Sequence, residues 1–292
     1  SNYGFKLKEY ENRLEKAQSL MHLNQIDILL ITSEQFMRYF TGFSTQFWQS
    51  PTRPWYLIIP IKGLPKAVIP DIGLSAMQKT WIKEIYTWPS PRPKDEGISL
   101  ISKLMNEFPS KFNYVGAELG KEMSLRMPLM DFFFLQSTLS RKIIDASSIL
   151  WELRLIKSNA EIDKIKHICK IASNSFENLP SLINKGDSER DIAKKMKMDL
   201  ISQGADSIPY LPVISGVGGV SQIIYEPTNR VLKSGDILFV DTGSTYDGYF
   251  CDFDRNYAFG RVASDVEKVY QILWQATEIG IKTAIPGATT ND

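Results

Sequence analysis

The pattern of apolar and polar residues in the first half of the chain predicts strands that alternate with helices. Short apolar runs predict buried strands at residues 26–32, 55–59, 66–69 and 114–119. Helical periodicity predicts helices at residues 5–24, 98–108 and 123–135. This alternation favours an α/β layer around a mainly parallel or mixed sheet.

The pattern changes near residue 150. Two long amphipathic helices are predicted there, one from residue 158 and one from residue 188. Strand-like runs then dominate up to residue 260, and a last helix is predicted over 264–281. Because 292 residues are many for one core, we expect two domains, over residues 1–150 and 151–292.

The dipeptide Asp247-Gly248 lies between two runs rich in aromatic and β-branched residues, which predicts a β-hairpin with these residues at its turn. A two-residue turn places Asp241 directly opposite Asp254. Asp252 is then diagonal to Asp241 and shares its face of the hairpin, because side chains two apart on a strand point the same way. Three carboxylates therefore project from one face.

Like charges at such separations repel each other, so this arrangement is unfavourable unless a cation lies among the carboxylates. The alternative is a solvated acidic face on an exposed hairpin. The surrounding strand residues are strongly apolar, with Phe239, Phe250 and Phe253 among them, which favours a metal site over a wet edge.

Composition and charge exclude other classes of function. A net charge of +1 predicts no electrostatic binding of nucleic acid or of anionic membranes. No apolar run is long enough to span a bilayer, and the first twenty residues lack the apolar segment of a secretory signal. The two cysteines lie in different predicted elements and suit reduced thiols, so we expect a cytoplasmic protein.

Several segments resemble the metallopeptidase superfamily of prolidase, aminopeptidase P, methionine aminopeptidase and creatinase. Similarity to the creatinase-type N-terminal domain is carried by NQIDILLIT and the RYFTGF after it. Similarity to the catalytic domain is carried by LRLIKSNAEIDKIKHICKIA, LKSGDILFVDTG and DGYFCDFDRN. The resemblance implies an α/β (α+β) fold in which a creatinase-type N-terminal domain precedes a pita-bread catalytic domain.

The resemblance also implies that Asp241 and Asp252 bind two divalent metal ions. Oxygen ligands accept manganese, zinc, cobalt or iron, so these residues do not select among them. The family completes its site with a histidine and two glutamates on strands further downstream, and the sequence stops at Asp292 before any segment that matches them. We therefore expect a pita-bread domain without its C-terminal part, lacking the proton-handling glutamate and inactive as it stands.

Two positions depart from the family's pattern. Peptidases of the family usually carry a histidine just before the segment that begins at Tyr225, and Ile224 stands there in this chain. Isoleucine cannot relay a proton, whereas Tyr225 itself is a candidate for substrate contact. Asp254 stands where threonine is usual, and could act as a further ligand, a base or a contact for a cationic substrate. The alternative for Asp254 is a salt bridge with Arg255.

In creatinase-like dimers the N-terminal domain of one subunit covers the active site of the other, so the resemblance implies a homodimer. The aromatic segment at residues 47–56 could form such a cover, with Arg53 or Trp55 contacting the substrate. The alternative is that these aromatic residues pack in a core, as those beside strands more often do.

The leading functional hypothesis is a metal-dependent hydrolase of the Xaa-Pro peptidase type, which cleaves a small amide or a short Xaa-Pro-like peptide with a metal-activated water. One alternative is a creatinase-like or ectoine-hydrolase-like enzyme that hydrolyses a non-peptide C–N bond, which Ile224 and Asp254 favour. The other is a non-catalytic binding protein on the same fold. The presence of both Asp241 and Asp252 argues against that last alternative.

Overall fold

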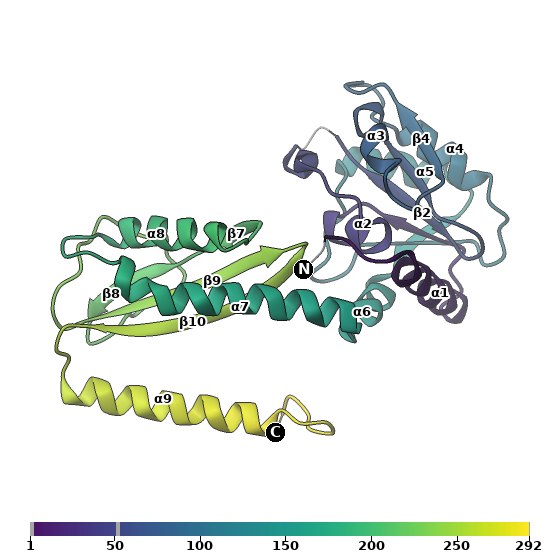
Figure 1. The fold of residues 1–292 in the computed structure, drawn as a ribbon. Coiled ribbons are helices and arrows are strands. Elements are labelled where there is room, and N and C mark those ends of the chain that lie inside the picture. The colour runs from purple at the N-terminus through teal and green to yellow at the C-terminus, as the bar shows by residue number, and fades with distance from the viewer. Residues whose placement is uncertain (1–2, 51–52, 292) are drawn as a thin grey trace. The chain divides into compact units, whose positions relative to one another are not determined.

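The computed structural model describes residues 3–50 and 53–291. They form two compact units, which we call the N-terminal unit, up to Ala160, and the C-terminal unit, from Glu161. Figure 1 shows both units, and each combines helices with a β-sheet. This agrees with the mixed α/β class that the sequence predicts.

A six-stranded mixed sheet forms the centre of the N-terminal unit. Its strand order is β4-β3-β2-β1-β5-β6, in which β1 is antiparallel to β2 and parallel to β5. Four of the six strands are predicted from the sequence, but β4 and β6 are not, because both are short and only partly buried and so lack a continuous apolar run. The strands are β1 (Ile28–Ile31), β2 (Tyr56–Pro60), β3 (Lys66–Pro70), β4 (Glu84–Trp88), β5 (Tyr114–Ala117) and β6 (Lys142–Asp145).

Helices cover both faces of this sheet. They are α1 (Leu7–Leu23), α2 (Glu34–Thr41), α3 (Leu74–Met77), α4 (Ile98–Asn106), α5 (Leu129–Thr138) and α6 (Ser147–Leu155), with 3-10 turns η1 (Gln46–Gln49) and η2 (Asp71–Gly73). On β1, Ile28 and Leu30 pack with α4 and α5, whereas Leu29 and Ile31 pack with α1, α2 and α6. Burial on both faces explains why the whole strand is apolar.

The helix expected over residues 123–135 begins later than predicted. It starts at Leu129, directly after Pro128. Proline cannot occupy a helix interior without removing a hydrogen bond and clashing with the preceding turn. The proline therefore sets the start of α5, and this part of the prediction is wrong.

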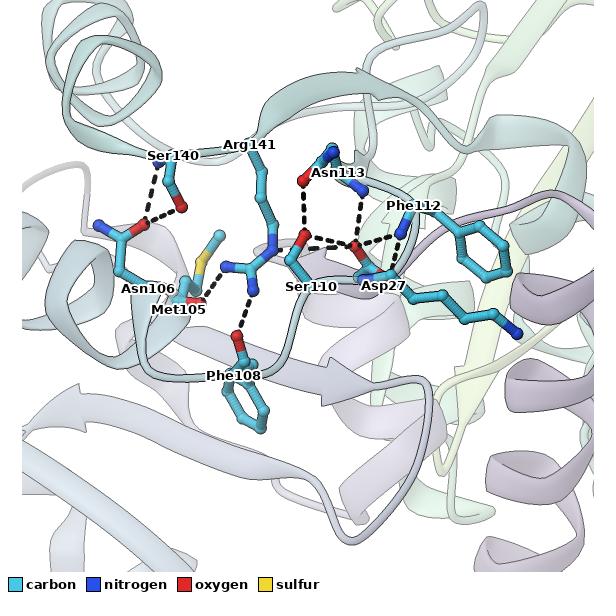
Figure 2. Close-up of polar contacts among 10 residues, drawn as sticks. Asp27, Met105, Asn106, Phe108, Ser110, Phe112, Asn113, Ser140 and Arg141 are labelled. Carbon is cyan, nitrogen blue, oxygen red and sulfur yellow. Dashed lines mark hydrogen bonds and ion pairs between the residues drawn. The ribbon is translucent and has the colours of Figure 1, made fainter.

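A buried polar cluster fixes the start of β1 (Figure 2). The carboxylate of Asp27 accepts hydrogen bonds from the hydroxyl of Ser110 at 3.2 Å and from the main-chain N–H groups of residues 111–113 at 2.8–3.1 Å. Arg141 Nε lies 3.8 Å from Asp27 Oδ2, with both side chains 1% exposed. The guanidinium of Arg141 also donates to two carbonyl oxygens near the end of α4. One carboxylate thus connects β1, the loop before β5 and the start of β6.

The C-terminal unit is built on a four-stranded antiparallel sheet. The central strand β9 (Asp236–Tyr246) pairs with β7 (Ser207–Tyr210), β8 (Val213–Val217) and β10 (Tyr249–Phe259). Figure 1 shows α7 (Asn159–Leu182) running along β9 and β10. The core between sheet and helices contains Ile168 and Ala172 of α7 and Ile192 and Met196 of α8. These two helices leave the opposite face of the sheet uncovered.

The helices α8 (Glu189–Ser202) and α9 (Ser264–Thr283) differ in capping and in burial. A capping box between Ser188 and Asp191 begins α8, with Ser188 as the N-cap. By contrast, α9 has no buried side chain. Among the residues described, no helix combines the length and the hydropathy needed to cross a bilayer.

Replacing Asp27 by asparagine tests the buried cluster. An amide cannot balance the charge of Arg141, so we expect the free energy of unfolding to fall by about 3–5 kcal/mol. Urea unfolding followed by tryptophan fluorescence measures this change. The matched control is Glu15→Gln on the exposed side of α1, which should stay within about 0.5 kcal/mol. A loss below about 1 kcal/mol for Asp27→Asn would contradict the assigned role.

Candidate metal centre

The hairpin has the register that the sequence predicts. Asp247 and Gly248 both have positive φ, at 49° and 81°, as a type I′ turn requires. Tyr246 pairs with Tyr249, and Asp241 pairs with Asp254. Asp252 lies opposite Gly243 and therefore diagonal to Asp241. The predicted placement of the three aspartates on one face is confirmed.

Helix α7 holds the turn of the hairpin in place. Lys164 Nζ lies 2.5 Å from Asp247 Oδ2, and each side chain is 5% exposed. The hydroxyl of Tyr249 donates to Glu161 Oε1 at 2.8 Å. The main-chain N–H of Asp247 also donates to Asp206 Oδ2 at 2.6 Å. These contacts fix the turn, and with it the strand register that aligns the aspartates.

The two faces of β10 have different surroundings. Cys251 is buried against α7 and α8, and the ring of Phe253 packs 5.4 Å from that of Phe176 on α7. Asp252 and Asp254 alternate with these residues and are exposed on the opposite face, whereas Asp241 on β9 is partly buried. The carboxylates therefore lie on the face that α7 and α8 leave uncovered.

The expectation that apolar side chains enclose the aspartates is only partly correct. Phe239 shares their face and is buried. Phe253 points to the other face, because strand side chains alternate. Phe250 shares the face of Asp252 but is 51% exposed. The sheet face that carries the three aspartates is consequently more exposed to solvent than the sequence suggests.

No counter-ion from the described part of the chain balances these carboxylates, since none of the three forms an ion pair there. Burial, together with the negative charges of Asp252 and Asp254, raises the pKa of Asp241 above its usual value. Arg255 does not form the alternative salt bridge with Asp254. Its guanidinium donates to the main-chain oxygen of Asp254 at 2.6 Å and lies 5.1 Å from the ring centre of Phe253.

Uncompensated carboxylates on one face suit a divalent cation, which prefers oxygen ligands. Within residues 3–50 and 53–291, however, no three side chains of histidine, cysteine, aspartate or glutamate come together as a metal site. Asp241 and Asp252 therefore fit part of a metal centre, and a bound ion needs further ligands.

The other predicted site residues lie elsewhere. Trp55 is fully buried in the core of the N-terminal unit, with its ring centre 5.2 Å from Phe43 and 5.9 Å from Trp48, as the alternative of core packing predicts. Arg53 belongs to the same unit, and its guanidinium lies 5.4 Å from the ring centre of Phe47.

Tyr225 lies in the loop between β8 and β9, and it lines a pocket of about 300 Å³. The residues that line this pocket include Arg230 and Glu189 but neither Asp241 nor Asp252. Tyr225 and the aspartates therefore do not share this pocket. Ile224 beside it is 86% exposed.

Tyr210 on β7 is a residue of this face that the sequence reasoning missed. Burial, a hydrogen bond to the side chain of Asp252 and the charges of Asp252 and Asp241 raise the pKa of Tyr210 well above its usual value. The signal that could have revealed it is Gly243, because glycine inside a strand often marks the close approach of another group.

Two family models match the chain, one on each unit. Residues 13–156 match the creatinase/prolidase N-terminal domain, and residues 163–292 match metallopeptidase family M24. The chain therefore combines a creatinase/prolidase N-terminal domain with a domain of metallopeptidase family M24. The uncharacterized peptidase YqhT of Bacillus subtilis is 27% identical to this chain over 280 residues, which are 95% of the chain and 73% of YqhT.

Further relatives of this chain are named as dipeptidases. The Xaa-Pro dipeptidase of Pyrococcus furiosus is 25% identical over 285 residues, which cover 97% of the chain and 74% of that protein. The crystal structure of recombinant prolidase from Thermococcus sibiricus superposes with a TM-score of 0.83 at 23% identity, over 97% of the chain and 73% of the prolidase. The creatinase-type N-terminal domain followed by a pita-bread domain is thereby confirmed.

Replacing Asp254 by asparagine removes the charge directly opposite Asp241. We expect the free energy of unfolding at pH 7 to rise by roughly 0.2–1 kcal/mol, because like charges across a strand pair destabilise the folded state. The pKa of Asp241 is raised by folding, so this repulsion is fully present above the folded-state pKa. It disappears as the pH falls below the unfolded-state value of about 3.9.

Urea unfolding at pH 7 and near pH 3 measures the effect of Asp254→Asn. The matched control is Glu177→Gln, an exposed acid on α7, which should change stability by less than about 0.5 kcal/mol at either pH. Equal stabilisation by Asp254→Asn at both pH values would show that charge repulsion is not its cause.

Proposed function

We propose that this chain is a metal-dependent hydrolase of the Xaa-Pro peptidase type, which acts on a short peptide or a small amide. The observation that carries the proposal is the pair of carboxylates of Asp241 and Asp252, which share an uncovered face and have no counter-ion among the residues described. The substrate class is supported by relatives named Xaa-Pro dipeptidase in two Pyrococcus species.

Asp241 and Asp252 would hold two divalent ions, of manganese, zinc, cobalt or iron, together with further ligands. When bound, such ions lower the pKa of a water to give hydroxide near neutral pH and polarise the scissile carbonyl. The partial burial of Asp241 strengthens its attraction to a cation, because nearby water screens the charge less there.

A second candidate is hydrolysis of a non-peptide C–N bond in a small cationic compound. Two observations favour it. Ile224 offers no group that exchanges a proton with a substrate, and Asp254 adds an exposed negative charge beside Asp241 that no ion pair within the described residues balances. The homodimer, the contact of Arg53 with substrate, the cytoplasmic location and the inactivity of the chain as it stands remain predictions.

Calorimetric titration of the full-length protein with Mn²⁺ tests the proposed metal ligands. Even outer-shell partners of a metal account for about 10–100-fold in affinity, so Asp241→Asn and Asp252→Asn should each weaken binding by more than about 100-fold. The matched control is Asp265→Asn on α9, an exposed aspartate, which should leave the affinity unchanged. Failure of the full-length protein to bind Mn²⁺, Zn²⁺, Co²⁺ or Fe²⁺ would favour a non-catalytic binding protein.

A substrate panel separates the two hydrolase candidates. It is run on the product of the source gene read past the codon for Asp292, loaded with Mn²⁺, and compares Xaa-Pro dipeptides with creatine-like and ectoine-like compounds. Cleavage of Xaa-Pro dipeptides alone supports the peptidase and excludes the second candidate. Cleavage of the non-peptide compounds alone supports the second candidate.

A further inference from the structure

Tyr210 of β7 reaches across β9 on the acidic face of the sheet. Its cross-strand partner on β9 is Gly243. A Cβ atom at position 243 would lie 2.0 Å from Cε1 and 2.3 Å from Cζ of the tyrosine ring, which is far closer than non-bonded atoms approach. The ring therefore occupies the space that any other residue at position 243 would fill.

Gly243 on the central strand β9 pairs with Tyr210 on β7 and with Asp252 on β10. The three residues therefore form one row across neighbouring strands. Adjacent strands are about 4.8 Å apart, so the outer two residues of the row are separated by about 10 Å between their backbones. A tyrosine and an aspartate side chain span this distance only when no side chain stands between them. Gly243 meets this requirement, so the tyrosine ring extends over position 243 toward the side chain of Asp252.

We propose that Tyr210 is a positioning residue that orients the carboxylate of Asp252 toward a divalent ion. This inference rests on the proposed metal-dependent function. A phenolic hydroxyl donates one hydrogen bond, so it can hold one carboxylate oxygen and leave the other free for the cation. Such outer-shell hydrogen bonds fix the orientation of metal ligands.

Tyr210→Phe removes the hydroxyl and keeps the ring. We expect the calorimetric affinity for Mn²⁺ to fall by about 10–100-fold while thermal unfolding stays unchanged, and the electron paramagnetic resonance spectrum of the bound ion to change. Tyr270→Phe, at an exposed tyrosine on α9, is the matched control and should leave affinity and spectrum unaltered. Equal Mn²⁺ affinity in Tyr210→Phe and wild type would overturn the inference.

Gly243→Ala provides a second variant, because it keeps the hydroxyl but displaces the ring from β9. The same loss of Mn²⁺ affinity is expected from it. Wild-type affinity in Gly243→Ala would contradict the requirement for close approach.

The carboxyl ¹³C resonance of Asp252 in the metal-free protein separates this inference from the proposed function. Loss of the hydroxyl should shift that resonance in Tyr210→Phe and leave the resonance of Asp265 in place. If the full-length protein binds no Mn²⁺, the proposed function fails, and the resonance decides whether Tyr210 holds Asp252. An unshifted resonance would overturn the inference in either case.

Discussion

The buried ion pair between Lys164 and Asp247 is the interaction on which the candidate metal centre depends. Two charges removed from water are stable only when they remain paired, so the turn that carries Asp247 cannot move away from α7. A change of one residue in the register would bring Asp252 to the face packed against α7 and remove it from the open one. The ion pair of Lys164 on α7 with Asp247 at the turn therefore fixes the positions of the three aspartates further along the hairpin.

Regularities that depend on local sequence were predictable. The Asp247-Gly248 turn and the two-residue period of strands are sufficient to pair Asp241 with Asp254. The change in periodicity near residue 150 predicts two domains, whereas the two compact units meet between Ala160 and Glu161. The family resemblance required the motifs around Asp241 and Asp252. Strands β4 and β6 escaped prediction because their partial burial weakens the apolar signal.

Features set by tertiary packing were not predictable. Nothing local to β10 says that α7 covers the face of Phe253, and hence that Arg255 stacks on aromatic rings and leaves the carboxylate of Asp254 unpaired. Tyr210 is distant in sequence from Asp252, and only the order of the strands places both in one row. The interior position of Trp55 likewise depends on rings supplied by other segments of the N-terminal unit.

Strand β10 is the last in the order of its sheet among the residues described, so one row of its main-chain groups is open to pairing with another chain. Charged side chains on an edge strand oppose such pairing, and β10 carries Asp252, Asp254 and Arg255. The acids proposed to hold cations therefore also protect the metal-free chain from aggregation.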